Sequence, residues 1–169
     1  LGMKNGLTKF FDQNGNLKLE LNYKNNLKHG KLREWKFQNG MIVPSLECYF
    51  KNGILDGQYK KYFNGIIFFE CFYSISVLDG PAVIYNFGQI EFETYFNMGK
   101  IDFYHKQYVN NKICLNVLFN EKKEVVVFNK FGKIECDEDI HRGKVYWEKI
   151  MEKYKIILKN KLDISYILD

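Results

Sequence analysis

Residues 61–80 read KYFNGIIFFECFYSISVLDG, and this stretch decides the fold. It places the pair Asn64-Gly65 between two runs rich in aromatic and β-branched residues. Asn-Gly between apolar runs is the strongest short-range hairpin signal, because a type I′ turn needs a positive φ at both central residues. The segment therefore predicts two antiparallel strands joined by a two-residue turn.

Asn-Gly recurs in the same register at Asn14-Gly15 and Asn39-Gly40, and the series extends along the chain at intervals of about 23 residues. Two other Asn-Gly pairs, Asn5-Gly6 and Asn52-Gly53, fall outside this register. The turn positions of the series are Gly15, Gly40, Gly65, Gly88, Asn111 and Gly132. The sequence therefore predicts five to six hairpin repeats.

Columns of like residues surround these turns. Two residues after each turn position stands an aliphatic residue: Leu17, Ile42, Ile67, Ile90, Ile113 and Ile134. Three residues before it stands an aromatic one: Phe37, Tyr62, Tyr85 and Tyr108. These columns face each other in a two-residue hairpin, so each repeat should hold an aromatic–aliphatic cross-strand pair. We expect the pairs to stack as the core, with the aliphatic column mostly buried.

The next columns extend the alternation. Four residues after the turn position the residue is mostly apolar: Leu19, Pro44, Phe69, Phe92, Leu115 and Cys136. Five residues after it the residue is mostly polar: Glu20, Ser45, Glu70, Glu93, Asn116 and Asp137. This period of two is typical of strands with one apolar and one polar face.

A second turn is expected between the repeats. Asp and Gly favour turns. We therefore predict the second turn at four segments, the last of which lacks the glycine: Leu27-Lys28-His29-Gly30, Leu55-Asp56-Gly57, Leu78-Asp79-Gly80 and Ile101-Asp102-Phe103. The sequence thus predicts a mainly β protein: a single antiparallel meander sheet of hairpin repeats over residues 1–136.

The repeat resembles a known family. The pattern Tyr62-Phe63-Asn64-Gly65, Glu70-x-x-Tyr73 and Leu78-Asp79-Gly80 is similar to the bacterial variant of the MORN repeat. The resemblance covers about residues 5–110 and, more loosely, 111–136, and Pro44 and Asn86-Phe87-Gly88 depart from it. It implies a binding scaffold, and some bacterial members of the family are classed as antitoxins.

Residues 137–169 change period. Apolar residues recur there mostly at steps of three and four, as on one face of an amphipathic helix: Tyr146, Ile150, Tyr154, Ile157 and Leu158. We expect one C-terminal amphipathic α-helix that caps the sheet in the same domain. A helix that binds a partner or a membrane surface is the alternative.

Charge and composition narrow the class of partner. The formal charge is +5, but basic and acidic residues are interleaved, so nucleic-acid binding is not expected. An acidic protein or an anionic membrane surface fits this charge. No apolar run approaches the ~18 residues of a membrane span, no signal peptide is visible, and Met3 after Leu1-Gly2 is the expected start. We therefore expect a cytoplasmic protein.

No pattern indicates catalysis. His29, His105 and His141 lack a metal-ligand companion at useful spacing and are expected at the solvent-exposed surface. The cysteines, Cys48, Cys71, Cys114 and Cys136, form no C-x-x-C motif, and we expect free thiols. Equivalent residues of adjacent hairpins lie about 9–10 Å apart, too far for a disulfide or a carboxylate pair such as Glu70 and Glu93. We expect no enzyme activity, cofactor, metal or small-molecule substrate.

One group of apolar residues breaks the alternation. Repeats two and three carry apolar residues on the face opposite the aromatic–aliphatic pairs: Met41, Val43, Phe63, Ile66 and Phe68. Such a patch is usually covered or functional. It is covered by the C-terminal helix or it binds a partner. The sequence thus favours a non-catalytic protein-binding scaffold of the antitoxin or immunity type, whose partner is another protein such as a toxin. A membrane-associated module is the alternative.

Overall fold

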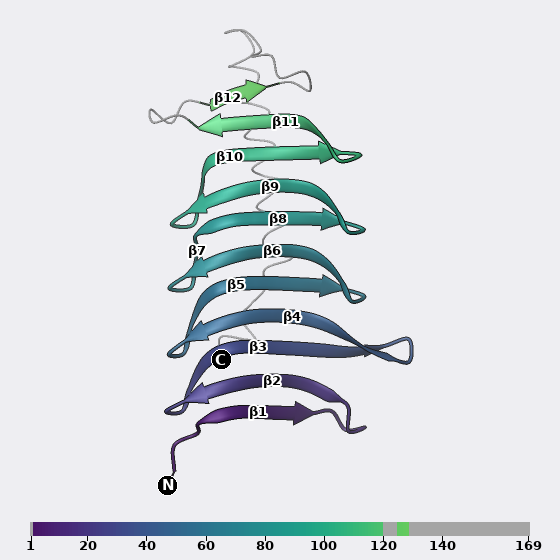
Figure 1. Ribbon diagram of the computed structural model, residues 1–169, viewed down its shortest axis with the longest axis vertical. Helices are drawn as coiled ribbons and strands as arrows, with labels where there is room; N and C mark the ends of the chain where they lie inside the picture. The colour runs from purple at the N-terminus through teal and green to yellow at the C-terminus, as the bar shows by residue number, and fades with distance from the viewer. Residues whose placement is uncertain (1, 120–124, 129–169) are drawn as a thin grey trace.

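The computed structural model describes residues 2–119 and 125–128. They form one antiparallel sheet in which successive strands lie side by side along the longest axis (Figure 1). The strand order is β1-β2-β3-β4-β5-β6-β8-β9-β10-β11-β12, and β7 pairs with β6. The predicted mainly β meander is confirmed. The helix expected within 137–169 lies outside the described residues.

The strand bounds follow the chain in order: β1 (Gly6–Phe11), β2 (Leu17–Lys24), β3 (Leu27–Gln38), β4 (Met41–Lys51), β5 (Ile54–Phe63), β6 (Ile66–Ser74), β7 (Val77–Leu78), β8 (Gly80–Asn86), β9 (Gln89–Asn97), β10 (Lys100–Val109), β11 (Lys112–Phe119) and β12 (Val125–Phe128).

Two-residue turns join neighbouring strands along one side of the sheet, at the ends of the strands. We name this side the Asn-Gly edge. Asn64 and Gly65 have φ values of 51° and 78°, as a type I′ turn requires, and the turns at 39–40, 87–88 and 110–111 are alike. The first hairpin differs. There the Asp12 carboxylate accepts the backbone N–H groups of Asn14 and Asn16, at 2.9 and 2.8 Å, and a longer loop results.

The predicted cross-strand pairs are confirmed. Tyr62 pairs with Ile67 on β5 and β6, and the register gives the same relation for the other three pairs: Phe37 with Ile42, Tyr85 with Ile90 and Tyr108 with Ile113. Just inside the Tyr62, Tyr85 and Tyr108 pairs, however, the register shifts by one residue, and the β1–β2 and β3–β4 hairpins have the same shift, in β3–β4 two residues further from the turn. A β-bulge therefore recurs in every described hairpin of the Asn-Gly edge.

The bulge reverses the expected faces. On β6, Ile67 pairs with Tyr62, whereas Phe69 pairs with Lys61, so these two β6 residues lie on opposite faces although they are two positions apart. The first five residues of the aliphatic column do share one face, but their burial was predicted wrongly, and Ile134 lies outside the described residues. Ile42 and Ile113 are 47% and 41% exposed, and Leu17, Ile67 and Ile90 are half-buried.

The core lies on the other face of the sheet. Its centre is a row of buried residues that runs across eight strands, each 3% exposed or less. The register brings them side by side: Leu21, Leu32, Cys48, Tyr59, Cys71, Ala82, Thr94 and His105. We name this side the core face and the side of the Tyr62–Ile67 pair the polar face. Cys48 and Cys71 are free thiols, as expected, whereas the side chains of Cys114 and Cys136 lie outside the described part of the chain.

The β3–β4 hairpin is longer than its neighbours and projects beyond them at the Asn-Gly edge (Figure 1). Trp35 and Pro44 pair next to the bulge, in the place of Tyr62 and Ile67. The predicted polar column was therefore wrong at one position in this repeat. Its member in this repeat is Glu47, which pairs with Lys60, and not Ser45, which is buried.

At the opposite edge, the turns precede the motif that was expected to form them. The turn residues with positive φ are Asn25-Asn26, Asn52-Gly53, Ile75-Ser76 and Met98-Gly99. The glycines of the motif lie within or next to the following strands, where Gly57 and Gly80 allow close approach. A Cβ atom on either would lie 3.1 Å from the Cβ of Tyr49 or of Phe72, respectively. We name this the Leu-Asp-Gly edge.

Candidate functional site

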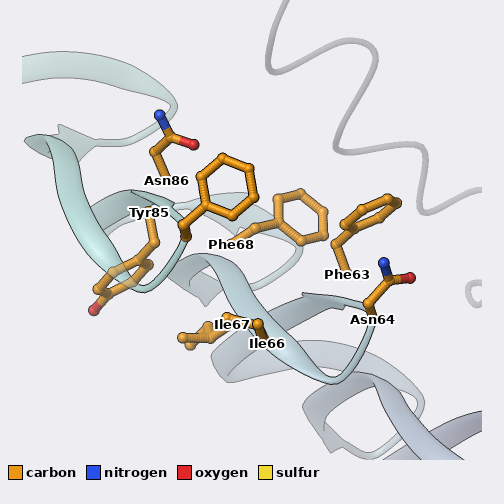
Figure 2. Close-up of a pocket in the computed structure, with 8 residues that line it drawn as sticks. Phe63, Asn64, Ile66, Ile67, Phe68, Tyr85 and Asn86 are labelled. Carbon is orange, nitrogen blue, oxygen red and sulfur yellow. The ribbon is translucent and has the colours of Figure 1, made fainter.

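An apolar groove opens at the Asn-Gly edge, between the β5–β6 and β8–β9 hairpins (Figure 2). Its volume is about 440 Å³. In Figure 2, Phe63 and Phe68 point to one side of the sheet and Tyr85 points to the other. The lining residues are Phe63, Asn64, Ile66, Ile67, Phe68, Tyr85, Asn86 and Phe87.

The groove contains three of the five predicted patch residues. Phe63 and Ile66 form the outermost pair of the β5–β6 hairpin and are 68% and 52% exposed. Phe68 is the bulge residue, and it packs half-buried against the core. The prediction that the patch lies opposite the aromatic–aliphatic pairs is confirmed. Its assignment to the outer face is wrong, because the patch continues the core face to the edge of the sheet.

The other two patch residues lie on the neighbouring hairpin. Met41 is 63% exposed near the tip of the β3–β4 hairpin, and Val43 is half-buried. A Cβ atom on Gly65 would lie 3.3 Å from the Val43 Cβ. Val43 thus packs against the turn that carries the groove, and neither Met41 nor Val43 lines the groove itself.

Sequence reasoning missed Phe87, the most exposed large apolar residue of the described chain at 94%. Phe87 occupies the first turn position, where the other turns of this edge have asparagine, and its φ is 48°. A bulky side chain in the left-handed region is strained, and such strain clusters at functional sites. The signal was in the sequence as Phe87-Gly88 in place of Asn-Gly.

Tyr85 connects the groove to the polar face. Its hydroxyl donates a hydrogen bond of 2.5 Å to Oε1 of Glu70. Burial, this hydrogen bond and the Glu70 charge raise the pKa of Tyr85 above its usual value. Tyr85 is therefore a neutral hydrogen-bonding group at neutral pH and not a general base.

The polar face carries a row of alternating charges beside the groove. Along β2 to β5 the register runs Glu20, Arg33, Glu47 and Lys60. Arg33 reaches Glu20 at 3.1 Å and Glu47 at 3.5 Å, and Lys31 reaches Glu47 at 2.7 Å. Glu20, which was predicted to be on the polar face of the strands, and Glu47 lie half-buried and ion-paired on the face opposite the core.

The row continues with Glu70, Val83, Glu93 and Lys106. Lys60 lies 3.6 Å from Glu70, and Lys106 lies 3.6 Å from Glu93. The Tyr108 hydroxyl donates to Glu93 at 2.7 Å, repeating the contact between Tyr85 and Glu70.

The two histidines of the described residues, His29 and His105, lie on different strands and do not form a site together. His29 is half-buried near the start of β3, where its Nδ1 accepts the Asn52 N–H at 3.3 Å. His105 was expected at the surface and is instead fully buried on the core face, stacked on Phe92 with ring centroids 5.9 Å apart. His141 lies outside the described residues. Within residues 2–119 and 125–128, no group of three or more His, Cys, Asp or Glu residues is arranged to hold a metal ion.

Comparisons with known proteins do not identify a relative. No protein-family model matches the chain, and no curated protein matches it. A solved structure described as the crystal structure of accessory secretory protein 1,2 and 3 in Streptococcus pneumoniae is similar at 13% identity and a TM-score of 0.25. That match covers 76% of this chain and 20% of the other, so this chain spans about a fifth of that protein's length. A TM-score this low carries no argument, and the MORN-like resemblance stays a prediction.

No helix in the part of the chain that the structure describes has the length and apolar character to cross a membrane.

Proposed function

We propose that this protein is a non-catalytic protein-binding scaffold, most concretely an antitoxin or immunity-type protein that neutralises a partner by direct binding. The observation that carries the proposal is the solvent-exposed apolar groove with Phe63, Ile66 and Phe87 around it. Large exposed apolar patches mark interaction sites, and aromatic anchors dominate interface energies.

The chemistry of the groove supports binding over catalysis. Its lining is aromatic, aliphatic or amide, and Tyr85, its one ionisable side chain, has a raised pKa. A rigid sheet also presents this surface with little loss of conformational entropy on association. The free, buried thiols of Cys48 and Cys71 fit a reducing compartment, and we place the protein in the cytoplasm.

Site-specific photo-crosslinking tests the proposal. A benzophenone amino acid in place of Phe87 should capture one defined protein in a native lysate. The matched control carries the same group in place of Phe11, which is 59% exposed but lies on β1, away from the groove. Ile66→Asp should abolish the adduct at position 87. Equal adducts at both positions, or none at position 87, would contradict the proposal.

The captured protein also tests the neutralising role. Expressed alone, it should arrest growth, and co-expression of the wild-type chain should restore growth. Co-expression of Ile66→Asp should fail to do so. A captured protein without any effect on growth would leave binding in place but would remove the antitoxin role.

A membrane-surface function is the second candidate, and one observation favours it. At the Leu-Asp-Gly edge, Ile75 and Met98 occupy turn tips at 69% and 71% exposure, with Leu27 and Ile54 exposed on the same edge. Lysines pair with this row, Lys24 with Leu27 and Lys51 with Ile54. Exposed apolar tips beside lysines suit an anionic lipid surface. Flotation with phosphatidylserine vesicles that is lost in Ile75→Ser/Met98→Ser would support this function.

A further inference from the structure

Three of the strands beside the groove, β6, β8 and β9, lie in a locally acidic stretch of a basic chain. The whole chain has 25 lysines and arginines against 20 acidic residues. Between Lys61 and Lys100, however, the sequence contains no lysine, arginine or histidine. The same segment contains four acidic residues: Glu70, Asp79, Glu91 and Glu93. Strands β6 and β9 therefore carry negative charge only, and β8 between them carries no charged residue.

Val83 interrupts the charge row at this place. In the neighbouring repeats the equivalent residues are Arg33, Lys60 and Lys106, each flanked in register by an acidic residue. Val83 has Glu70 on one side and Glu93 on the other. Directly opposite residues in a sheet have Cβ atoms about 4.5–5.5 Å apart, so both carboxylates border the half-buried Val83 side chain.

The negative charges of Glu70 and Glu93 are each paired with one cation of the sheet, whereas that of Glu47 is paired with two. Glu47, inside the regular row, has Lys31 at 2.7 Å and Arg33 at 3.5 Å. Glu70 has Lys60 at 3.6 Å on one flank and Val83 on the other. Glu93 likewise has Lys106 at 3.6 Å on one flank and Val83 on the other. Their side chains keep 23% and 27% of their surface exposed, so a cation from solution can approach both.

Tyr85 makes this position continuous with the groove. It lies two residues after Val83 on β8, and side chains at that spacing point to the same face about 7 Å apart. Tyr85 lines the groove and donates its hydroxyl to Glu70. Ile67 and Tyr85 form the part of the groove that lies on the polar face, the same face as Val83. One extended segment of a partner can therefore place an apolar side chain against Ile67 and Tyr85 and a cation above Val83.

We propose that the groove takes a segment of a protein partner in which an apolar side chain stands next to an arginine or lysine, whose cation lies above Val83 between Glu70 and Glu93. This proposal rests on the proposed function and names the chemistry of its partner. The partner's cation supplies the positive charge that Arg33, Lys60 and Lys106 supply in the other repeats. Because bidentate hydrogen bonds to a carboxylate favour guanidinium, arginine should bind better than lysine.

The test uses defined peptides and the full chain labelled with ¹⁵N. The probe is an acetylated, amidated tetrapeptide Gly-Trp-Arg-Gly, and its control has citrulline, the neutral analogue of arginine. The arginine peptide should shift the amide resonances of β6 and β8 saturably and bind roughly fivefold more tightly than the citrulline peptide. This difference should shrink in high salt.

Val83→Lys is the decisive variant, because it restores the missing cation from within the sheet. It should keep the fold, as lysine occupies the equivalent positions 60 and 106, and it should reduce arginine-peptide affinity to that of the citrulline peptide. Val83→Ile is the matched control and should retain the preference. Equal affinities for both peptides, an unchanged preference in Val83→Lys, or no saturable shift on β6 and β8 would overturn the cation site.

Failure of this proposal is distinguishable from failure of the proposed function. If both peptides bind equally and Ile66→Asp abolishes both, the groove is a binding site but does not select a cation. If the crosslink at position 87 captures a partner that binds Val83→Lys as well as it binds the wild type, the scaffold function holds and the cation site fails.

Discussion

Ile67 and Phe69 are two residues apart on β6 and lie on opposite faces of the sheet. Phe68 between them is the extra residue of a β-bulge, so Tyr62 pairs with Ile67 while Lys61 pairs with Phe69. Phe69 is 1% exposed in the core, and Ile67 is half-buried on the polar face. The bulge thus decides which of the two side chains stabilises the fold.

Paired alanine substitutions should separate the two faces. Phe69→Ala is expected to lower the free energy of unfolding by about 3–5 kcal/mol, because it leaves a cavity in the core. Ile67→Ala is expected to lower the free energy of unfolding by about 1 kcal/mol, because the Ile67 side chain is only half-buried and its removal leaves no cavity in the core. Equilibrium urea unfolding measures both. Equal losses would mean that the bulge is misplaced.

The meander could be predicted from sequence, but the bulge could not. Asn64-Gly65 and the flanking alternation gave the hairpin and the pairing of Tyr62 with Ile67, because turn type and strand period are local properties. The bulge residues have no type in common: Lys18, Ser45, Phe68, Glu91 and Cys114. One extra residue exchanges the faces of everything beyond it, and so the alternation was assigned to the wrong side.

The candidate site was predictable only in part. Phe63, Ile66 and Phe68 were found because they are apolar where neighbouring repeats are polar. Phe87 was missed because it was counted as a turn residue. The turns Ile75-Ser76 and Met98-Gly99 were not predicted, because isoleucine and methionine have low turn propensity. They adopt positive φ because the strands on either side are paired.

Phe87 offers a test of stability against function. Phe87→Asn places in the turn the residue that the neighbouring turns have, and it should raise the free energy of unfolding by about 0.5–1 kcal/mol through relief of left-handed strain. The same change removes an aromatic anchor and should weaken partner binding. Urea unfolding and a binding assay on one preparation check both effects. A loss of stability would show that the Phe87 side chain is held by intramolecular packing.

His105 should make stability fall in acid. Burial lowers the pKa of His105 from 6.5 to about 4, so the folded state binds fewer protons than the unfolded state between these values. Its contribution is therefore complete above about pH 6.5 and is lost as the pH falls towards 4, by up to about 3 kcal/mol. The variant His105→Leu carries the residue found at the equivalent position 32. It should remove this fall in stability between about pH 6.5 and pH 4. Urea unfolding between about pH 7 and pH 4 measures the difference, and identical profiles would contradict the burial of the imidazole.

The two core thiols should react slowly. Burial raises the pKa of Cys48 to about 12 and that of Cys71 well above its usual range. The thiolate is the reactive form, so both should resist alkylation at neutral pH until the protein unfolds. Mass spectrometry after timed iodoacetamide treatment, with and without urea, locates the adducts. Rapid labelling of either residue in the native protein would show that the central row is open to solvent.

Ile66→Asp distinguishes a free groove from one that residues 129–169 cover. Ile66 is 52% exposed, so the substitution should shift the melting temperature by no more than about 3 °C. Phe69→Asp, on the same strand but in the core, is the control and should abolish the cooperative transition. A large loss of stability in Ile66→Asp would show that the remaining chain occupies the groove and would remove it as a partner site.

The most direct measurement of the central claim is the dissociation constant of the crosslinked partner for wild-type protein and for Ile66→Asp, determined side by side by calorimetry. Phe11→Asp, an exposed apolar position on β1, serves as the control for an added charge. The groove account predicts that Ile66→Asp weakens binding by roughly 30-fold or more, as for an anchor worth 2 kcal/mol or more, while Phe11→Asp leaves it unchanged. An unaltered dissociation constant for Ile66→Asp would show that the partner binds elsewhere on the molecule.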